Sequence, residues 1–399
     1  MPSVRVTLDR SVVDIDKEVF TKLFRDSVVS DYAPIRKVLD NAESISFTDL
    51  RKLARTAEIP YALFFAPLPV VEQQLGLKTA KLMAGFSKKQ FSMNSRNTVA
   101  LADIELIVKN LLQKQHYLAQ DESLPSKHPV MGLLKHSRRP VADDAQRLSE
   151  RLGFSSEDIG RARNRKAAFE QFVQAVESRQ IFVGRSAHHY MPQNIPAGAR
   201  FSGLTVKDKR VPWIFLASGD EGEGSSEPDG RKIFTLALLV VLVAQGTFAP
   251  VTYSDHTKEE QRPREYDVTA EFLMPEAEFR RETISDLDDV KRLADRYKVT
   301  PSAAVMRVRR LGLLPRQVTA DFLDALQAEY DSRPKLGPRR GWKPVNALRA
   351  YNGVECSRRM LQLLDAGVLA PAEFTRVMFS NKLGKQDIDD YRRAIAATL

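Results

Sequence analysis

The most apolar stretch of the chain is LALLVVLVA, residues 236–244, inside the longer run IFTLALLVVLVAQG. It holds no charge, and with Thr235 and Gln245 as interruptions it is shorter than the roughly 17–25 apolar residues that span a bilayer. We therefore expect it to be buried in a protein core. A continuous apolar run suits a helix or a buried strand, and its valines favour a strand, so the pattern alone leaves both open.

Short strands are expected before this run. QIFVG at 180–184, FSGLTV at 201–206 and WIFL at 213–216 are compact apolar segments separated by turn-forming residues. Near the N-terminus, residues 4–16 alternate between polar and apolar positions and could form a strand or an irregular arm. These segments predict a small amount of sheet.

Helical spacing dominates the rest of the chain. Ser46 followed by Asp49 fits a helix start, and the next apolar residues follow at helical spacing. Residues 286–314 predict two helices, with Thr300 as the N-cap of the second and Pro301 at its first position. Gly367 predicts the end of a later helix. The expected fold class is α+β and predominantly α-helical.

The motifs around the apolar run resemble the peptidase domain of the ImmA/IrrE family of bacterial and phage zinc metallopeptidases. FTLA at 234–237 matches the start of that family's FTLAHELGH motif, and AEFLMP at 270–275 matches the end of the helix that carries the third zinc ligand. The resemblance implies that the apolar run is a helix. It also implies a zincin-like domain with a small sheet, flanked by helical N- and C-terminal domains.

In such peptidases HExxH binds zinc because two histidines four residues apart share a helix face, while the glutamate activates a water. The matching residues here begin with Leu238 and Leu239 and end with Leu242, so both histidine positions and the glutamate position are leucine. The third-ligand position falls on Arg262, and the family's asparagine is Tyr266.

Other metal ligands are few. A small shift could bring Glu259, Glu260 or Glu265 to the third-ligand position, but no shift restores the histidines. His188 and His189 are adjacent rather than four apart, and His256 stands alone. We predict no metal, no cofactor and no catalytic residue: a peptidase scaffold that is not an enzyme.

Residues 1–69 resemble a degenerate form of the Xre-type helix-turn-helix region that precedes the peptidase in long family members, on the match of residues 47–65. The DNA-binding candidates there are Arg36, Lys37, Arg51, Lys52 and Arg55. Packing or dimerisation is the alternative role. Residues 70–175 are expected to be a helical connector and residues 176–285 the peptidase-like domain.

Residues 286–399 are expected to form a C-terminal helical region. Arg307, Arg309 and Arg310 lie on the second helix of the pair at 286–314. Read from its pattern alone, that helix could enter a DNA major groove. The matching segment of the ImmA/IrrE family packs on the peptidase core and helps to hold a protein, so we favour partner binding for these arginines.

Charge and cysteine content indicate the kind of partner and the cellular compartment. The chain of 399 residues has 61 Lys and Arg against 51 Asp and Glu, a net charge of +10, which fits an anionic partner. Its one cysteine excludes an intramolecular disulfide framework and a cysteine zinc finger. The N-terminus lacks the apolar core of a signal peptide, so we expect a cytoplasmic protein.

Together these features predict a non-catalytic regulator, antitoxin-like or repressor-like. The resemblance implies a protein partner, such as a PIN-type ribonuclease toxin encoded by an adjacent gene, and binding to its own operator DNA. One alternative is an active zinc metallopeptidase with displaced ligands that cleaves a repressor. A second is a stand-alone transcription factor.

Overall fold

The computed structural model describes residues 3–8, 10–25, 35, 38, 44–83, 101–195, 201–217, 228–252, 263–332 and 343–398. The chain forms two compact units, one from residues 1–85 with 100–109 and the other from 86–99 with 110–399. The division falls inside helix α5 (Leu101–Leu118). Neither boundary predicted around the connector, at 70 or at 176, separates the units.

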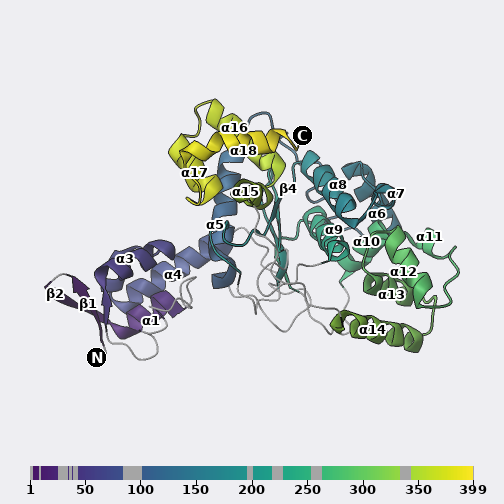
Figure 1. Ribbon diagram of the computed structural model, residues 1–399, viewed down its shortest axis with the longest axis horizontal. Coiled ribbons are helices and arrows are strands. Elements are labelled where there is room, and N and C mark those ends of the chain that lie inside the picture. Colours follow the sequence, from purple (N-terminus) through teal and green to yellow (C-terminus); the bar gives the residue numbers. More distant parts are fainter. Residues whose placement is uncertain are drawn as a thin grey trace. The chain divides into compact units, whose positions relative to one another are not determined.

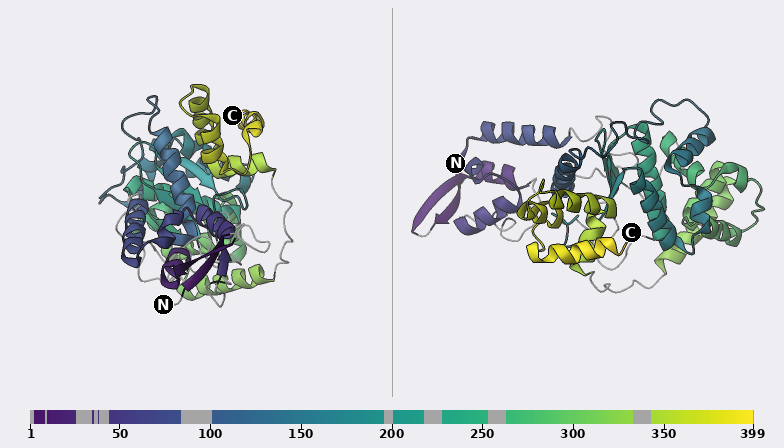
Figure 2. Two further views of the ribbon diagram at one scale, coloured as in Figure 1. Left: turned by 90° about the vertical axis from the view of Figure 1, so that its left-hand side faces the viewer. Right: turned by 90° about the horizontal axis from the view of Figure 1, so that it is seen from above.

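The first unit is built on a three-stranded sheet with the order β2-β1-β3. Strand β1 (Ser3–Leu8) pairs antiparallel with β2 (Ser11–Asp16) and parallel with β3 (Ser44–Ser46). The hairpin of β1 and β2 forms one end of this unit (Figure 2). The alternation at 4–16, which could have been a strand or an irregular arm, is thus a hairpin of two strands.

The helices of the first unit pack on this sheet around a cluster of phenylalanines. The Phe24 and Phe64 rings lie 4.9 Å apart between centroids, and Phe20 packs on Phe24 at 5.0 Å. Ser46 caps α3 as predicted, because its hydroxyl accepts the Asp49 amide at 3.0 Å. The elements are α1 (Lys17–Arg25), α3 (Phe47–Thr56), η1 (Tyr61–Phe65) and α4 (Leu68–Met83).

The second unit contains a four-stranded sheet with the order β4-β6-β5-β7. β4 (Phe182–Arg185) is parallel to β6 (Trp213–Leu216), and β5 (Phe201–Val206) is antiparallel to both β6 and β7 (Pro250–Thr252). Every residue of β5 and β6 is buried, which explains their almost continuous apolar sequence. The three strands predicted from the sequence are confirmed, and β7 is additional.

The apolar run forms most of helix α9 (Asp229–Gln245), at the centre of the second unit (Figure 1). It packs on β5 and β6 on one side and on α8 (Arg165–Ser178) and α10 (Arg264–Leu273) on the other. Because it is covered on all sides, residues 235–244 are all buried and the helix is apolar all round. The preference of valine for strands yields to this packing.

The helices before the sheet share one core with α9. Leu148, Ile159 and Phe172, from three successive helices, belong to the same buried cluster as the residues of α9. The helices within residues 141–178 therefore contribute to the core around α9. Besides α8, the helices are α6 (Val141–Leu152) and α7 (Ser156–Arg161).

The helices after α10 are those expected for the C-terminal region. Thr300 caps α13 with Pro301 in its first turn, and Gly367 follows α16 with a φ of 72°, as predicted. α15 packs on β4 and on α18. The elements are α11 (Glu276–Phe279), α12 (Leu287–Arg296), α13 (Pro301–Arg310), α14 (Arg316–Asp331), α15 (Pro344–Asn352), α16 (Val354–Asp365), α17 (Pro371–Phe379), η2 (Lys385–Asp387) and α18 (Ile388–Ala396). Among the described residues, no helix is both long and apolar enough to cross a membrane.

Candidate functional site

The three leucines that the sequence resemblance aligns with HExxH lie inside the core on α9. Leu238 is 3% exposed, and Leu239 and Leu242 are 0% exposed. Leu239 approaches β5 so closely that a Cβ added to Gly203 would lie 2.9 Å from its Cδ1. Leu239 is thus an aliphatic side chain that packs against the sheet.

The C-terminal end of α9 is closed by backbone groups. The amides of Gly132 and Leu134 donate to the carbonyls of Val243 and Ala244, at 3.2 and 2.8 Å, and Gly246 ends the helix with a φ of 72°. The carbonyls that a helix end leaves unpaired are therefore satisfied. We call residues 130–134 the capping loop.

His128 fixes the start of the capping loop. Its Nδ1 accepts the amides of Val130 and Met131 at 3.1 and 3.0 Å, while its Nε2 lies 3.2 Å from the Gln180 carbonyl oxygen. Only a neutral ring with the proton on Nε2 makes all three bonds. Burial lowers the pKa of His128 accordingly. Both ring nitrogens of this histidine are bonded to backbone groups, so neither is available to a metal.

On the α10 side, aromatic rings pack against α9. The Tyr266 ring, which the sequence resemblance aligns with the family's asparagine, lies 6.5 Å from that of Phe234 on α9. Glu265 is partly buried on α10, and this burial raises its pKa. Arg262, Glu259 and Glu260 lie outside the described residues.

The side chains around α9 do not fit a zinc ion. A leucine has no donor atom, and a buried dication without ligands is strongly disfavoured. The His188 and His189 rings lie 4.0 Å apart in the loop after β4, and His256 lies outside the described residues. In the described part of the chain, no three His, Cys, Asp or Glu side chains form a group that could hold a metal ion.

The arginines of α13 are partly or wholly internal. Arg307 is 5% exposed; it pairs with Glu271 of α10, and its Nε donates to the Met274 carbonyl at 3.0 Å. Arg310 pairs with Asp267 at 2.9 Å, and Arg309 is partly buried. Because a buried side chain offers no surface to a partner, Arg307 contributes to the core and not to a binding surface.

Three of the predicted DNA-binding residues lie on α3 of the first unit. Arg51, Lys52 and Arg55 are all exposed, on a helix whose buried residues are Leu50, Leu53 and Ala54. Arg36 and Lys37 lie outside the described residues.

Sequence patterns did not reveal a cluster of buried polar groups between α5, α8 and the C-terminal helices. The Lys114 Nζ lies 4.1 Å from the centroid of the Tyr351 ring and has no hydrogen-bond partner among the described residues. Burial lowers the pKa of Lys114 to about 7 and raises that of the Cys356 thiol to about 12. A lone lysine in a helical pattern gives no sign of burial, because its partners come from distant segments.

Glu177 completes this cluster at the end of α8. One oxygen of its carboxyl accepts the Glu355 amide at 3.3 Å, in the first turn of α16, so it satisfies a free amide of that helix. Burial raises the pKa of Glu177 to about 8.

The fold and this site define an α+β, mostly helical protein built around a central apolar helix. In agreement, residues 224–309 match the model of the IrrE N-terminal-like domain, Peptidase_M78. This segment holds α9, α10 and most of α13, and the match supports the ImmA/IrrE family and fits a regulatory or protease-like role. Comparison with curated proteins and with solved structures gives no match.

Proposed function

We propose that this protein is a non-catalytic regulator that binds and neutralises a partner protein, in the manner of an antitoxin or repressor. The observation that carries the proposal is the burial of Leu238, Leu239 and Leu242 in α9. An enzyme that needs a zinc-bound water cannot use these side chains. A scaffold that has lost such chemistry still offers a protein-binding surface.

Charge supports an acidic partner. The net charge of +10 favours encounter with an acidic surface, such as the carboxylate-lined metal site of a ribonuclease toxin. Arg309 and Arg310 near the C-terminal end of α13 are partly accessible cations. Inhibition would be steric: the regulator covers the active site and leaves the partner intact.

The exposed cations of α3 support a second part of the proposal, binding to operator DNA. The exposed side of α3 carries Arg51, Lys52 and Arg55, so these cations are accessible to phosphates. Repression would then be joined to partner binding in one chain.

The test uses the full-length chain together with the product of the adjacent gene. We expect that product alone to arrest growth and co-expression to rescue it. The two proteins should co-elute in a fixed ratio, with the partner at its full mass by mass spectrometry. Arg309→Glu with Arg310→Glu should weaken the complex at least ten-fold, whereas Arg393→Glu on exposed α18 should leave it unchanged.

A cleaved partner would contradict the proposal, as would stoichiometric zinc whose removal by a chelator abolishes the rescue. The two results together would establish the active peptidase.

Electrophoretic shift of the upstream DNA, with and without the partner, tests the proposed binding to operator DNA. Alanine at Arg51, Lys52 and Arg55 should abolish the shift. Repression that is unaffected by any neighbouring gene product would favour a stand-alone transcription factor.

A further inference from the structure

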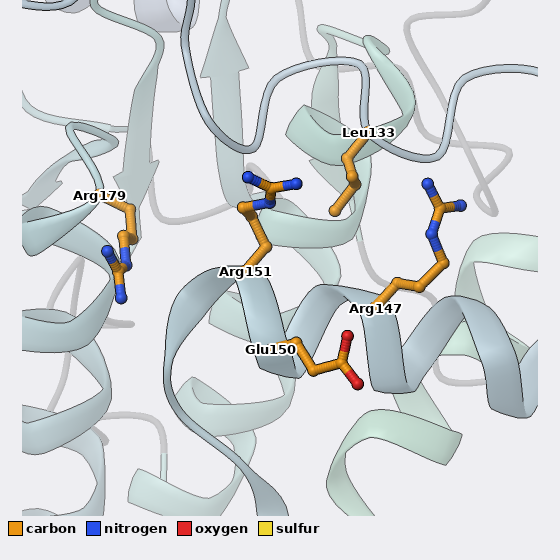
Figure 3. Close-up of a pocket in the computed structure, with 5 residues that line it drawn as sticks. All are labelled: Leu133, Arg147, Glu150, Arg151 and Arg179. Carbon is orange, nitrogen blue, oxygen red and sulfur yellow. The ribbon is translucent and has the colours of Figure 1, made fainter.

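Three arginines surround a hollow of about 340 Å³ on the second unit, at the C-terminal half of α6. Arg147 and Arg151 lie one turn apart on α6, Arg179 follows α8, and Leu133 comes from the capping loop. Figure 3 shows the guanidinium groups of Arg147 and Arg151 on either side of Leu133. The carboxylate of Glu150, which also lines the hollow, points away from them.

The positive charges of this hollow are mostly unneutralised. Glu150 accepts a hydrogen bond from Gln146 at 2.9 Å, and Arg151 makes no ion pair with any described residue. Arg147 lies 3.8 Å from Asp144, whose carboxylate is already bound by Arg264 at 2.7 Å. The lining includes three arginines and one glutamate, so its residues carry two excess positive charges.

Arg179 is exposed, but a hydrogen bond to backbone anchors its side chain. Its Nε donates to the Leu152 carbonyl at 3.0 Å, at the end of α6. Its guanidinium passes so close to Gly153 that a Cβ there would lie 2.8 Å from Nη2. Gly153 also adopts a φ of 66°, which suits glycine. The turn after α6 therefore leaves space for this side chain at the rim of the hollow.

We propose that this hollow binds the phosphoryl group of a small phosphomonoester. A phosphomonoester carries about two negative charges near pH 7, which would offset the two excess positive charges. Guanidinium groups match phosphate oxygens with paired hydrogen bonds, and arginine is the side chain best suited to that geometry. The hollow is large enough to hold part of an attached organic group beside Leu133.

Binding at this place has a structural consequence. Leu133 belongs to the capping loop, whose Gly132 and Leu134 amides close the end of α9. A ligand seated between that loop and α6 would tie the loop that closes the end of the central helix to α6. Occupancy should therefore stabilise the second unit against unfolding.

The test is calorimetric titration of the full-length protein with inorganic phosphate, AMP and adenosine. We expect one phosphate-bearing ligand per chain, no binding of adenosine, and at least ten-fold weaker binding to Arg151→Gln. The matched control is Arg393→Gln, which removes an exposed arginine of α18 and should bind as the wild type does. Equal affinity for phosphate and AMP assigns recognition to the phosphoryl group alone, whereas tighter binding of AMP shows that the organic part is read as well.

Two results would overturn the proposal. One is wild-type affinity in Arg151→Gln, or no binding of phosphate and AMP to a folded wild-type protein. The other is binding of duplex DNA that depends on Arg151 while phosphate and AMP do not bind, because it would assign these arginines to a nucleic-acid backbone. Circular dichroism and the unliganded melting temperature of each variant show whether it has folded.

Discussion

Arg307 of α13 and Glu271 of α10 form an ion pair in which both side chains are less than a tenth exposed. Glu271 also accepts the Glu276 amide at 3.1 Å, and Arg307 donates to the Met274 carbonyl. One buried pair thus fixes the turn after α10 against the α12–α13 helices. The arginine that seemed suited to a partner instead connects two parts of the same core.

Removing one member of this pair should destabilise the protein strongly. Arg307→Ala leaves the Glu271 carboxylate buried without its partner, at a cost of about 3–5 kcal/mol in the free energy of unfolding. Urea denaturation measures the change. Arg393→Ala, which breaks an exposed pair with Asp390, should cost at most about 1 kcal/mol. Equal effects of the two variants would contradict the buried pair.

A glutamate at Leu239, the position that the sequence resemblance aligns with the peptidase glutamate, should damage the fold. Leu239→Glu places a carboxylate at a fully buried position against β5, where an unpaired charge is expensive to bury. We expect loss of the cooperative melting transition or a large drop in melting temperature. Leu239→Met keeps the volume and the apolar character and should cost less than about 1.5 kcal/mol. A stable Leu239→Glu protein would show that α9 borders open space.

Gly353 should be much less replaceable than Gly367, another glycine with a positive φ. An added Cβ would lie 2.4 Å from the Val183 carbonyl oxygen and 2.5 Å from Glu177, in addition to the strain of a φ of 77°. At Gly367, with a φ of 72°, nothing lies within 4 Å. Gly367→Ala should therefore cost about 1 kcal/mol from the backbone alone. Gly353→Ala should cost clearly more in the same denaturant titration.

Lys114 should make stability depend on pH in the alkaline range. Because burial lowers its pKa to about 7 in the folded protein from 10.5, the unfolded chain takes up a proton first as the pH falls. This contribution to stability is present above pH 10.5 and is lost as the pH falls towards 7. Lys114→Met should flatten the profile between these values, measured by denaturant unfolding at several pH values. An unchanged slope would place the Lys114 amine in water.

Glu177 should change stability with pH in the opposite direction from Lys114, and over a lower pH range. Its folded pKa of about 8 exceeds the ordinary value of 4.5, so the folded protein keeps this proton longer than the unfolded chain. Stability from this group is full below pH 4.5 and is lost as the pH rises through 8. Glu177→Gln should remove that decline while it keeps an oxygen for the Glu355 amide. A steeper decline in the variant would refute this assignment.

Local signals in the sequence predicted the elements whose causes are local. Ser46 and Thr300 cap their helices because their hydroxyls reach amides three residues on, and such contacts can be inferred from spacing. The helical state of the central apolar run could not be inferred from spacing, since an unbroken apolar run fits a helix or a buried strand. Its assignment as a helix came from the matching motifs on either side of it.

Features that depend on distant segments were not predicted. β3 is three residues long and pairs with a strand about forty positions earlier, so no local pattern marks it. The burial of Arg307 depends on Glu271, and the arginine hollow joins residues of α6 to Arg179 and the capping loop. Charged residues at helical spacing look the same whether they face water or another helix.

The buried thiol of Cys356 can report how often the C-terminal helices open. It is the chain's single cysteine and has 0% exposure, and its raised pKa keeps it protonated and unreactive in the folded state. A thiol reagent in excess would therefore modify the protein only when α16 separates from its neighbours, once per molecule. The rate of that single labelling event would report how often the native packing around α8 and α15 is transiently lost.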